Sequence, residues 1–149
     1  MTTSPTDTFV VDGSVVAKWT LSEEEHGDRA LRLSDRFITA RIQLAAPEYL
    51  ELEVAAAVNG ASRGRRQRLP PGEAQRAIED FRMLPIELAP TAPLLVPAHL
   101  LTLRYNCAFY GALYLALAQR LNTTLVTADR RFYAAVQRLP EVVWIGDYE

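Results

Sequence analysis

The sequence predicts a single α/β domain built around a central, mostly parallel sheet. The chain has 149 residues, the size of one ordinary domain with a sizeable core. Hydrophobic residues make up 49% of it and charged residues 23%, a balance typical of a globular rather than a disordered chain. Short apolar runs alternate with segments whose apolar residues recur at helical spacing. This alternation is typical of parallel strands connected by helices.

The first half of the chain contains one predicted strand and two predicted helices. A polar tail, residues 1–8, precedes the apolar run "FVV", which ends at Asp12 and is typical of a buried strand. Ser22 and Glu25 match a capping box, so a helix is expected from there to about residue 38. A second helix is expected to begin at Pro47, because the apolar residues that follow fall on one face. Gly60 is its expected stop.

The second half begins after the polar turn "SRGRRQRLPPGE" and alternates again. Helices are expected over residues 72–83, 91–105, 107–121 and 132–136, and strands over 85–88, 123–129 and 142–146. The helix over 107–121 contains Gly111 in its first turns, where glycine costs about 1 kcal/mol relative to alanine. No repeat or interdomain linker is visible, so residues 9–149 are expected to form the one domain.

The net charge, the lengths of the apolar runs and the cysteine count limit the kinds of function that the protein can have. The net charge is −2, so nucleic-acid binding has to be local and cannot come from a basic field over the whole surface. No apolar run approaches the roughly 20 residues of a membrane span, and the N-terminus lacks the pattern of a signal peptide. A single cysteine, Cys107, rules out an internal disulfide and fits a reducing compartment. We therefore expect a cytoplasmic protein without a membrane segment.

Three acidic residues are the first chemical clue. Asp12 ends the strand "FVVD", Asp129 ends "LVTAD", and Glu53 lies on the helix that follows Pro47. Ligands of parallel sheets bind outside the carboxyl ends of the strands, so acids at neighbouring strand ends would meet there. Clustered carboxylates repel one another unless a cation is present, and Mg2+ or Mn2+ prefers such oxygen ligands. Two such ions can activate water and stabilise the leaving oxygen of a phosphodiester.

Each acid also has an ordinary structural explanation. An aspartate after a strand is a common helix cap or turn residue. Glu53, between two apolar neighbours, could be a solvated helix position. The three acids indicate a metal site only when they are taken together.

Four segments in order resemble the PIN domain, and more closely the VapC-type toxins of bacterial toxin–antitoxin pairs. They are "FVVDGSVVAKW", "APEYLELEVAAAV", "FYGALYLALAQRL" and "LVTADRRF", and the order and spacing hold from about residue 9 to residue 145. The resemblance implies an α/β/α sandwich with a parallel sheet and a Mg2+- or Mn2+-dependent endoribonuclease. It also implies inhibition by a cognate VapB-like antitoxin and a homodimer, which is common in the family.

The resemblance also assigns roles to single residues. The acids of the family match Asp12, Glu53 and Asp129, which implies that these three hold the metal and carry catalysis. Ser14 matches a small hydroxyl residue two places after the first acid, and Thr127 matches the threonine of a "T-x-D" signature. These hydroxyls would orient carboxylates or metal-bound waters, or else bond the local backbone at a strand-to-helix turn.

The sequence departs from the family pattern at two positions. Gly111 stands where the pattern "Y-D-A-L-Y" has an aspartate, and Ala56 stands where some members carry asparagine. Without the aspartate the site loses a charge and an oxygen ligand, so cation affinity should fall. Water can replace a ligand of Mg2+ but supplies no charge. Three explanations stay open: a natural nuclease that is weakened or holds one metal, a catalytically silent relative, or an engineered glycine.

Arginines are the candidate contacts for RNA. The candidates are Arg63, Arg65, Arg66, Arg68 and Arg130. Arginine suits bidentate phosphate contacts, although a charge run such as "RGRRQR" is more often a solvated turn. Arg130 and Arg131 could instead balance the acids or receive the antitoxin. Phe109, Tyr110 and Tyr114 are expected to pack in the core or a dimer more than to stack on bases.

Three function classes follow from these patterns. The leading one is a VapC-like endoribonuclease that hydrolyses RNA phosphodiesters, with activity reduced by Gly111. The second is a catalytically silent PIN module that binds an antitoxin or RNA. The third is a phosphatase with Asp12 as nucleophile, suggested by "VVDGS". That chemistry normally needs a second aspartate where this chain has Ser14.

Overall fold

The structure, a computed structural model, describes residues 7–149 and has a parallel sheet at its centre. The strands lie in the order β3-β2-β1-β4-β5, and every neighbouring pair is parallel. Their bounds are β1 Thr8–Val11, β2 Gln43–Pro47, β3 Glu87–Ala89, β4 Leu125–Thr127 and β5 Val142–Trp144. The chain builds the sheet outward from β1 in one direction and then returns to add β4 on its other side. The carboxyl ends of β1 and β4 therefore form the switch point where ligands of such sheets bind.

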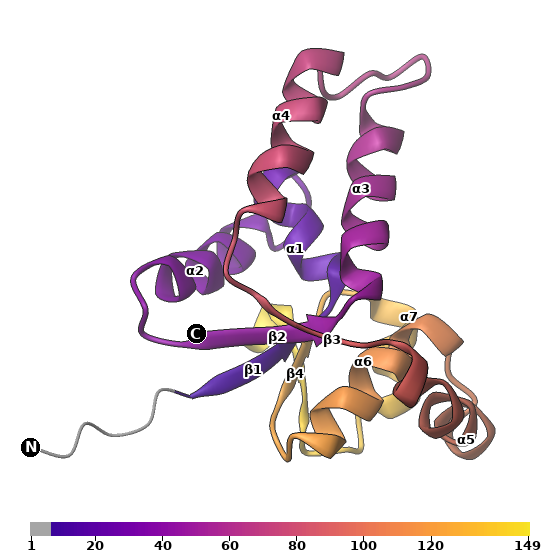
Figure 1. Ribbon diagram of the computed structural model, residues 1–149. Coiled ribbons are helices and arrows are strands. Elements are labelled where there is room, and N and C mark those ends of the chain that lie inside the picture. The colour runs from indigo at the N-terminus through magenta and orange to yellow at the C-terminus, as the bar shows by residue number, and fades with distance from the viewer. Residues whose placement is uncertain (1–6) are drawn as a thin grey trace, which may run out of the picture.

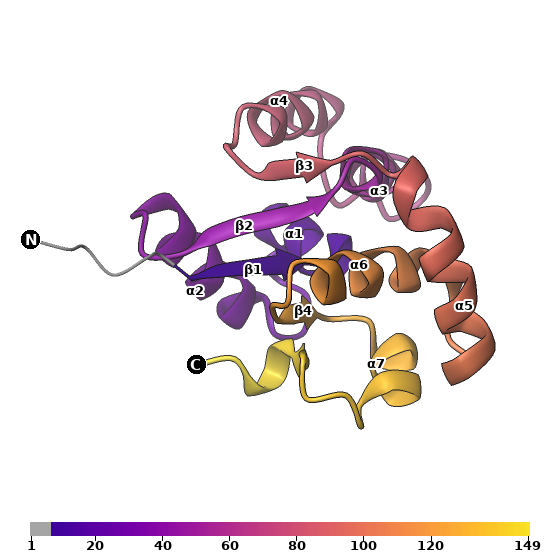
Figure 2. The ribbon, with the colours of Figure 1, turned by 60° about the horizontal axis from the view of Figure 1, so that its bottom comes forward.

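Helices cover both faces of this sheet. Figures 1 and 2 show α6 on one face, where it contacts β1, β2 and β4, and α1 with α2 on the other face. The pair α3 and α4 projects from the sheet as a long hairpin (Figure 1). The helix bounds are α1 Gly13–Thr20, α2 Gly27–Ile38, α3 Tyr49–Ala61, α4 Pro71–Arg82, α5 Leu95–Tyr105, α6 Phe109–Arg120 and α7 Arg130–Val136. The α/β/α sandwich expected from the sequence is confirmed.

The core explains why the two central strands have continuous apolar sequences. Val10, Val11, Leu125 and Val126 are each at most 1% exposed. Helices lie on both sides of the sheet, so side chains that point to either face must be apolar. None of the helices within residues 7–149 is long and apolar enough to cross a membrane.

The first half of the chain differs from the sequence prediction in three segments, of which residues 13–38 are the first. The capping box is wrong, because α2 begins at Gly27 after a left-handed His26 without a side-chain cap. The acids of that segment bind arginines from other elements instead: Glu23 pairs with Arg68 and Glu25 with Arg130. The helix α1 was not predicted, because its valines continue the apolar run of the strand.

The second difference concerns Pro47. It ends the strand β2 rather than beginning a helix, and α3 runs from Tyr49 through Gly60 to Ala61. The strand "QLAAP" was missed because alanine has little strand preference, whereas here burial between two other strands decides.

The third difference concerns the N-terminal tail, predicted as residues 1–8. Residues 1–6 lie outside the described part of the chain. Thr8 already belongs to β1, where it pairs with Gln43, so the tail ends before residue 8.

Candidate active site

Parallel pairing brings the first and last predicted acids to one edge of the sheet. Val10 pairs with Leu125 and Val11 with Val126, so both strands end at the same level. The backbone N–H of Asp12 continues this ladder by donating to the Val126 carbonyl at 3.0 Å. Asp12 and the segment that carries Asp129 therefore leave the sheet side by side.

Asp12 is a buried carboxylate held by two donors. It is 4% exposed, and its Oδ2 accepts from the Thr127 hydroxyl at 2.7 Å. Its Oδ1 accepts from the backbone N–H of Ser14 at 3.3 Å, so it also caps α1. Burial raises the pKa of Asp12, although the hydrogen bonds from Thr127 and Ser14 act in the opposite direction. The cap explanation is therefore correct, but the burial goes beyond what a cap requires.

Two hydroxyls join the ends of β1 and β4. The Thr127 hydroxyl donates to Asp12 and accepts from the backbone N–H of Asp129 at 3.1 Å. The Ser14 hydroxyl accepts from the backbone N–H of Ala128 at 3.0 Å. Each hydroxyl thus bonds across the two segments, so the chain that follows β1 and the chain that follows β4 are fixed relative to each other.

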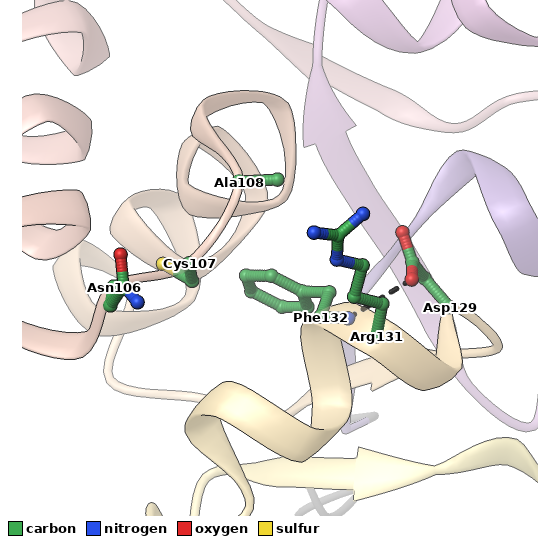
Figure 3. A pocket seen from close by; sticks show the side chains of 6 residues that line it. All are labelled: Asn106, Cys107, Ala108, Asp129, Arg131 and Phe132. Atoms are coloured by element: carbon green, nitrogen blue, oxygen red, sulfur yellow. Dashed lines mark hydrogen bonds between the residues drawn. The ribbon is translucent and has the colours of Figure 1, made fainter.

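Asp129 is the exposed member of the set. It is the N-cap of α7, and its Oδ1 accepts from the backbone N–H of Phe132 at 3.0 Å (Figure 3). Such a cap is a common use of aspartate after a strand. Its other carboxylate oxygen has no hydrogen bond within residues 7–149.

Glu53 reaches the same place from α3. Its Oε1 accepts from the Tyr114 hydroxyl at 2.6 Å, and Tyr114 is completely buried in α6. Burial, together with the charges of Asp12 and Asp129, raises the pKa of Glu53 to about 7. Glu53 is thus not a solvated helix position. The role of Tyr114 was missed, because the sequence favoured packing in the core or a dimer over base stacking for it. The spacing gives no sign that its hydroxyl faces an acid.

Gly13 makes the approach of Glu53 possible. A Cβ atom at Gly13 would lie 2.5 Å from Glu53 Oε1, a separation that real Cβ atoms do not show. The glycine that follows Asp12 therefore leaves the space in which the Glu53 carboxylate lies. This second requirement was also missed, because "VVDGS" reads equally well as an ordinary turn.

The space at Gly111 is filled by a ring. A Cβ atom there would lie 2.6 Å from Cε2 of Phe132, which is 2% exposed. The glycine in this helix thus has a packing explanation, since Phe132 occupies the place of the missing side chain. Ala56, the other departure from the family pattern, is exposed on α3.

The predicted RNA-binding arginines are not gathered at the acids. Arg63, Arg65 and Arg66 are exposed in the turn between α3 and α4, at the far end of the hairpin in Figure 1. Arg68 pairs with Glu23 at 2.7 Å and with Glu24 at 3.1 Å.

Arg130 is closer to the site but is also engaged. It pairs with Glu25, and its guanidinium lies 5.2 Å from the centre of the Trp144 ring. Its charge is therefore already paired with an acid outside the set.

The chemistry of the acid set suits a hard cation. Asp12, Glu53 and Asp129 make no ion pair within residues 7–149, although the first two are largely buried. Buried carboxylates that have no cationic side chain as a partner take up a proton or bind a metal. Over the same residues no three His, Cys, Asp or Glu side chains stand close enough to form a ready-made metal cluster. Mg2+ keeps several waters, so it tolerates such a wide set of oxygen ligands.

Comparison with known proteins decides the family. The sequence model of the PIN-domain family matches residues 9–137 of this chain. The VapC ribonuclease Mb0985 of Mycobacterium bovis is 32% identical over 96 residues, which cover 64% of this chain and 72% of that protein. The chain belongs to the PIN-domain family and is of the VapC type. Ribonuclease VapC9 of Mycobacterium tuberculosis matches this VapC-type chain with the same identity and coverage.

Solved structures agree on the fold of this VapC-type chain. PAE2754 from Pyrobaculum aerophilum superposes with a TM-score of 0.67 at 21% identity and covers 97% of this chain and 93% of its own. VapBC2 from Rickettsia felis, bound to a promoter DNA fragment, gives 0.61 at 13% identity, with 92% and 96% covered. A toxin–antitoxin complex from Klebsiella pneumoniae gives 0.57 at 18% identity, with 90% and 94% covered.

Proposed function

We propose that this VapC-type protein is a divalent-metal-dependent endoribonuclease that hydrolyses RNA phosphodiesters. The observation that carries the proposal is that Asp12, Glu53 and Asp129 lie around the switch point of the sheet, near enough for the charges of the two aspartates to raise the pKa of Glu53. Two of these carboxylates are largely buried, and none is neutralised by an arginine or lysine within residues 7–149. The ribonuclease names of its VapC relatives support the choice of RNA as substrate.

The three acids would hold Mg2+ or Mn2+. When bound, the cation supplies a Lewis acid that activates water and stabilises the leaving oxygen. The protein contributes positioning: Thr127 holds one oxygen of Asp12, and Tyr114 holds one oxygen of Glu53. The lone pairs of the carboxylate oxygens that these bonds do not use would serve as ligands. Because both orienting hydroxyls are at most 1% exposed, the carboxylates do not have to be ordered when the cation binds.

Gly111 is proposed to weaken this site. The family pattern has an aspartate at that position, so the chain offers one carboxylate fewer, and the Phe132 ring takes up the space. Lower cation affinity and slower cleavage are expected. The same observation favours a second candidate, a catalytically silent PIN module that binds an antitoxin or RNA.

Partners form the remaining part of the proposal. A VapB-like antitoxin is proposed because the fold matches that of solved toxin–antitoxin assemblies. A homodimer is proposed because α5 exposes an apolar stripe at helical spacing. The exposed side chains are Leu95, Val96, Leu100 and Leu103. A cytoplasmic location fits the RNA substrate and the single free cysteine, Cys107.

The direct test is cleavage of a labelled single-stranded RNA by the purified protein. Cleavage is expected with Mn2+, and none is expected with EDTA. Asp12→Asn should abolish it, whereas Asp35→Asn, an exposed acid on α2, should leave it unchanged. Cleavage that persists in EDTA or in Asp12→Asn would contradict the proposal. Lack of cleavage by the unaltered chain would favour the silent module.

A further inference from the structure

A cavity lies beside the acid site, between α7 and the turn that joins α5 to α6 (Figure 3). Its volume is about 340 Å³, within the range of small-ligand sites. The lining residues are Asn106, Cys107, Ala108, Asp129, Arg131 and Phe132. Asp129 belongs to both the cavity and the acid set. The cavity therefore adjoins the acid set directly.

Arg131 gives this cavity a cationic group. Its neighbour Arg130 is engaged with Glu25 and Trp144, but Arg131 makes no ion pair among residues 7–149. In Figure 3 its guanidinium lies between the Phe132 ring and Asp129. A cation in the first turn of a helix faces the positive end of the helix dipole, so Arg131 does not stabilise α7 in this way. A guanidinium in this place suits a phosphate, which it can hold with two parallel hydrogen bonds.

Asn106 supplies a neutral polar group on the opposite wall. It ends α5 in the left-handed conformation, with φ 53°, and its side-chain amide is exposed at the cavity (Figure 3). An amide both donates and accepts, so it can pair with the edge of a base or with a ribose hydroxyl. The wall between the two polar groups is formed by Cys107, Ala108 and Phe132. The cavity thus combines a guanidinium, a carboxylate and an amide with the apolar side chains of its wall.

We propose that this cavity binds the nucleotide next to the cleaved phosphodiester of single-stranded RNA, with Arg131 on its phosphate and Asn106 on its base or ribose. The proposal rests on the proposed function, because it takes the acids as the place of cleavage. RNA is favoured over an acidic peptide because the cavity shares Asp129 with the proposed place of cleavage, so a nucleotide beside the cleaved phosphodiester would lie within reach of it. The amide of Asn106 also matches groups that a nucleotide offers.

Equilibrium binding of an end-labelled, mixed-sequence single-stranded RNA tests this proposal. Fluorescence anisotropy in EDTA, at several salt concentrations, would compare the unaltered protein with Arg131→Gln. The matched control is Arg138→Gln, an exposed arginine that follows α7 and does not line the cavity. Loss of one phosphate contact should weaken binding about tenfold. It should also reduce the slope of log K against log salt concentration by about 0.7. The control should leave both quantities unchanged, and Asn106→Ala should weaken binding without changing the slope.

An unchanged affinity and slope in Arg131→Gln would overturn the subsite, as would equal effects of Arg131→Gln and Arg138→Gln. Lack of RNA binding by the unaltered protein would overturn it too. If Arg131→Gln instead lost binding to a glutamate-rich peptide and kept that to RNA, the cavity would be a peptide site. Cleavage in Mn2+ separates the two proposals. If the protein cleaves RNA but Arg131→Gln has the same salt slope as Arg138→Gln, the proposed function holds and the subsite is refuted. If the protein does not cleave RNA but Arg131→Gln reduces the salt slope, the cavity binds RNA and the proposed function is refuted.

Discussion

Two glycines in this protein have the same geometry and opposite consequences for the site. At Gly13 and at Gly111 the position of a Cβ atom is already occupied by a side chain from another element. At Gly13 the occupant is the carboxylate of Glu53, and at Gly111 it is the ring of Phe132. The first glycine brings an acid to the sheet edge. The second stands where the family pattern has an acid and admits a hydrocarbon ring instead.

The two glycines therefore predict different effects of substitution. Glu53 is a flexible side chain whose carboxylate can move, so a change at Gly13 should alter the chemistry more than the stability. Phe132 is buried in the core, so a change at Gly111 should alter the stability more than the chemistry. Hydrogen bonds thus hold the carboxylates of Asp12 and Glu53, whereas side-chain packing holds α6 around Gly111.

The largest expected effect is on the pH dependence of stability, and it comes from Glu53. Its pKa is about 7 in the folded protein and 4.5 when unperturbed, so the folded state binds more protons between these values. The contribution of Glu53 to stability is therefore complete at and below about pH 4.5 and is lost as the pH rises from there through its folded pKa of about 7. The expected loss is about 3 kcal/mol in the metal-free protein. Urea unfolding at several pH values should show this fall, and Glu53→Gln should remove most of it.

Glu48→Gln is the matched control, because Glu48 is the exposed N-cap residue of the same helix. It should keep the fall with pH. Identical pH profiles for the unaltered protein and Glu53→Gln would show that Glu53 is not the group that titrates.

The next largest effect is on cleavage by Gly13→Ala. The added methyl group would displace the Glu53 carboxylate, and a displacement of this size costs about a hundredfold in rate. Stability should change little. Gly60→Ala on α3 is the control, since a Cβ there meets no atom within 4 Å. Single-turnover cleavage of RNA would measure both variants. An equal rate for Gly13→Ala and Gly60→Ala would refute the role of Gly13.

A smaller effect, on stability, is expected for Gly111→Ala. The methyl group would overlap the Phe132 ring, and overpacking of this kind costs about 1–3 kcal/mol. Phe132→Leu should relieve the overlap, so the double variant should be more stable than the sum of the single changes predicts. Strict additivity in urea unfolding would show that the two positions do not compete for space.

The smallest effect is expected for Tyr114→Phe. Removing the hydroxyl costs Glu53 one hydrogen bond, which is worth about 1 kcal/mol. Because this bond lowers the pKa of Glu53, its loss should raise that pKa further. Carboxyl signals in NMR titrations, compared with those of Tyr105→Phe outside the site, would detect the change. A pKa of Glu53 that does not move, or moves down, would contradict the assigned bond.

The sequence was most informative where chemistry and periodicity coincide. Asp12 and Asp129 follow apolar runs that are typical of buried strands, so their placement at one edge of the sheet could be predicted. Gly13 and Tyr114 could not, because their roles arise from the contacts of Glu53 on α3 with α1 and α6, which are far from it in the chain. β2 was missed for a similar reason: its alanines become a strand through burial between its neighbours.

The central claim is that Asp12, Glu53 and Asp129 form a cation site that Gly111 leaves one ligand short. Calorimetric titration of Mn2+ at neutral pH tests it most directly. We predict that the unaltered protein binds Mn2+ and that Asp12→Asn loses at least about tenfold in affinity. The double variant Gly111→Asp with Phe132→Leu, which has room for the new carboxylate, should bind more tightly than Phe132→Leu alone. Equal affinities across these four proteins would contradict the claim.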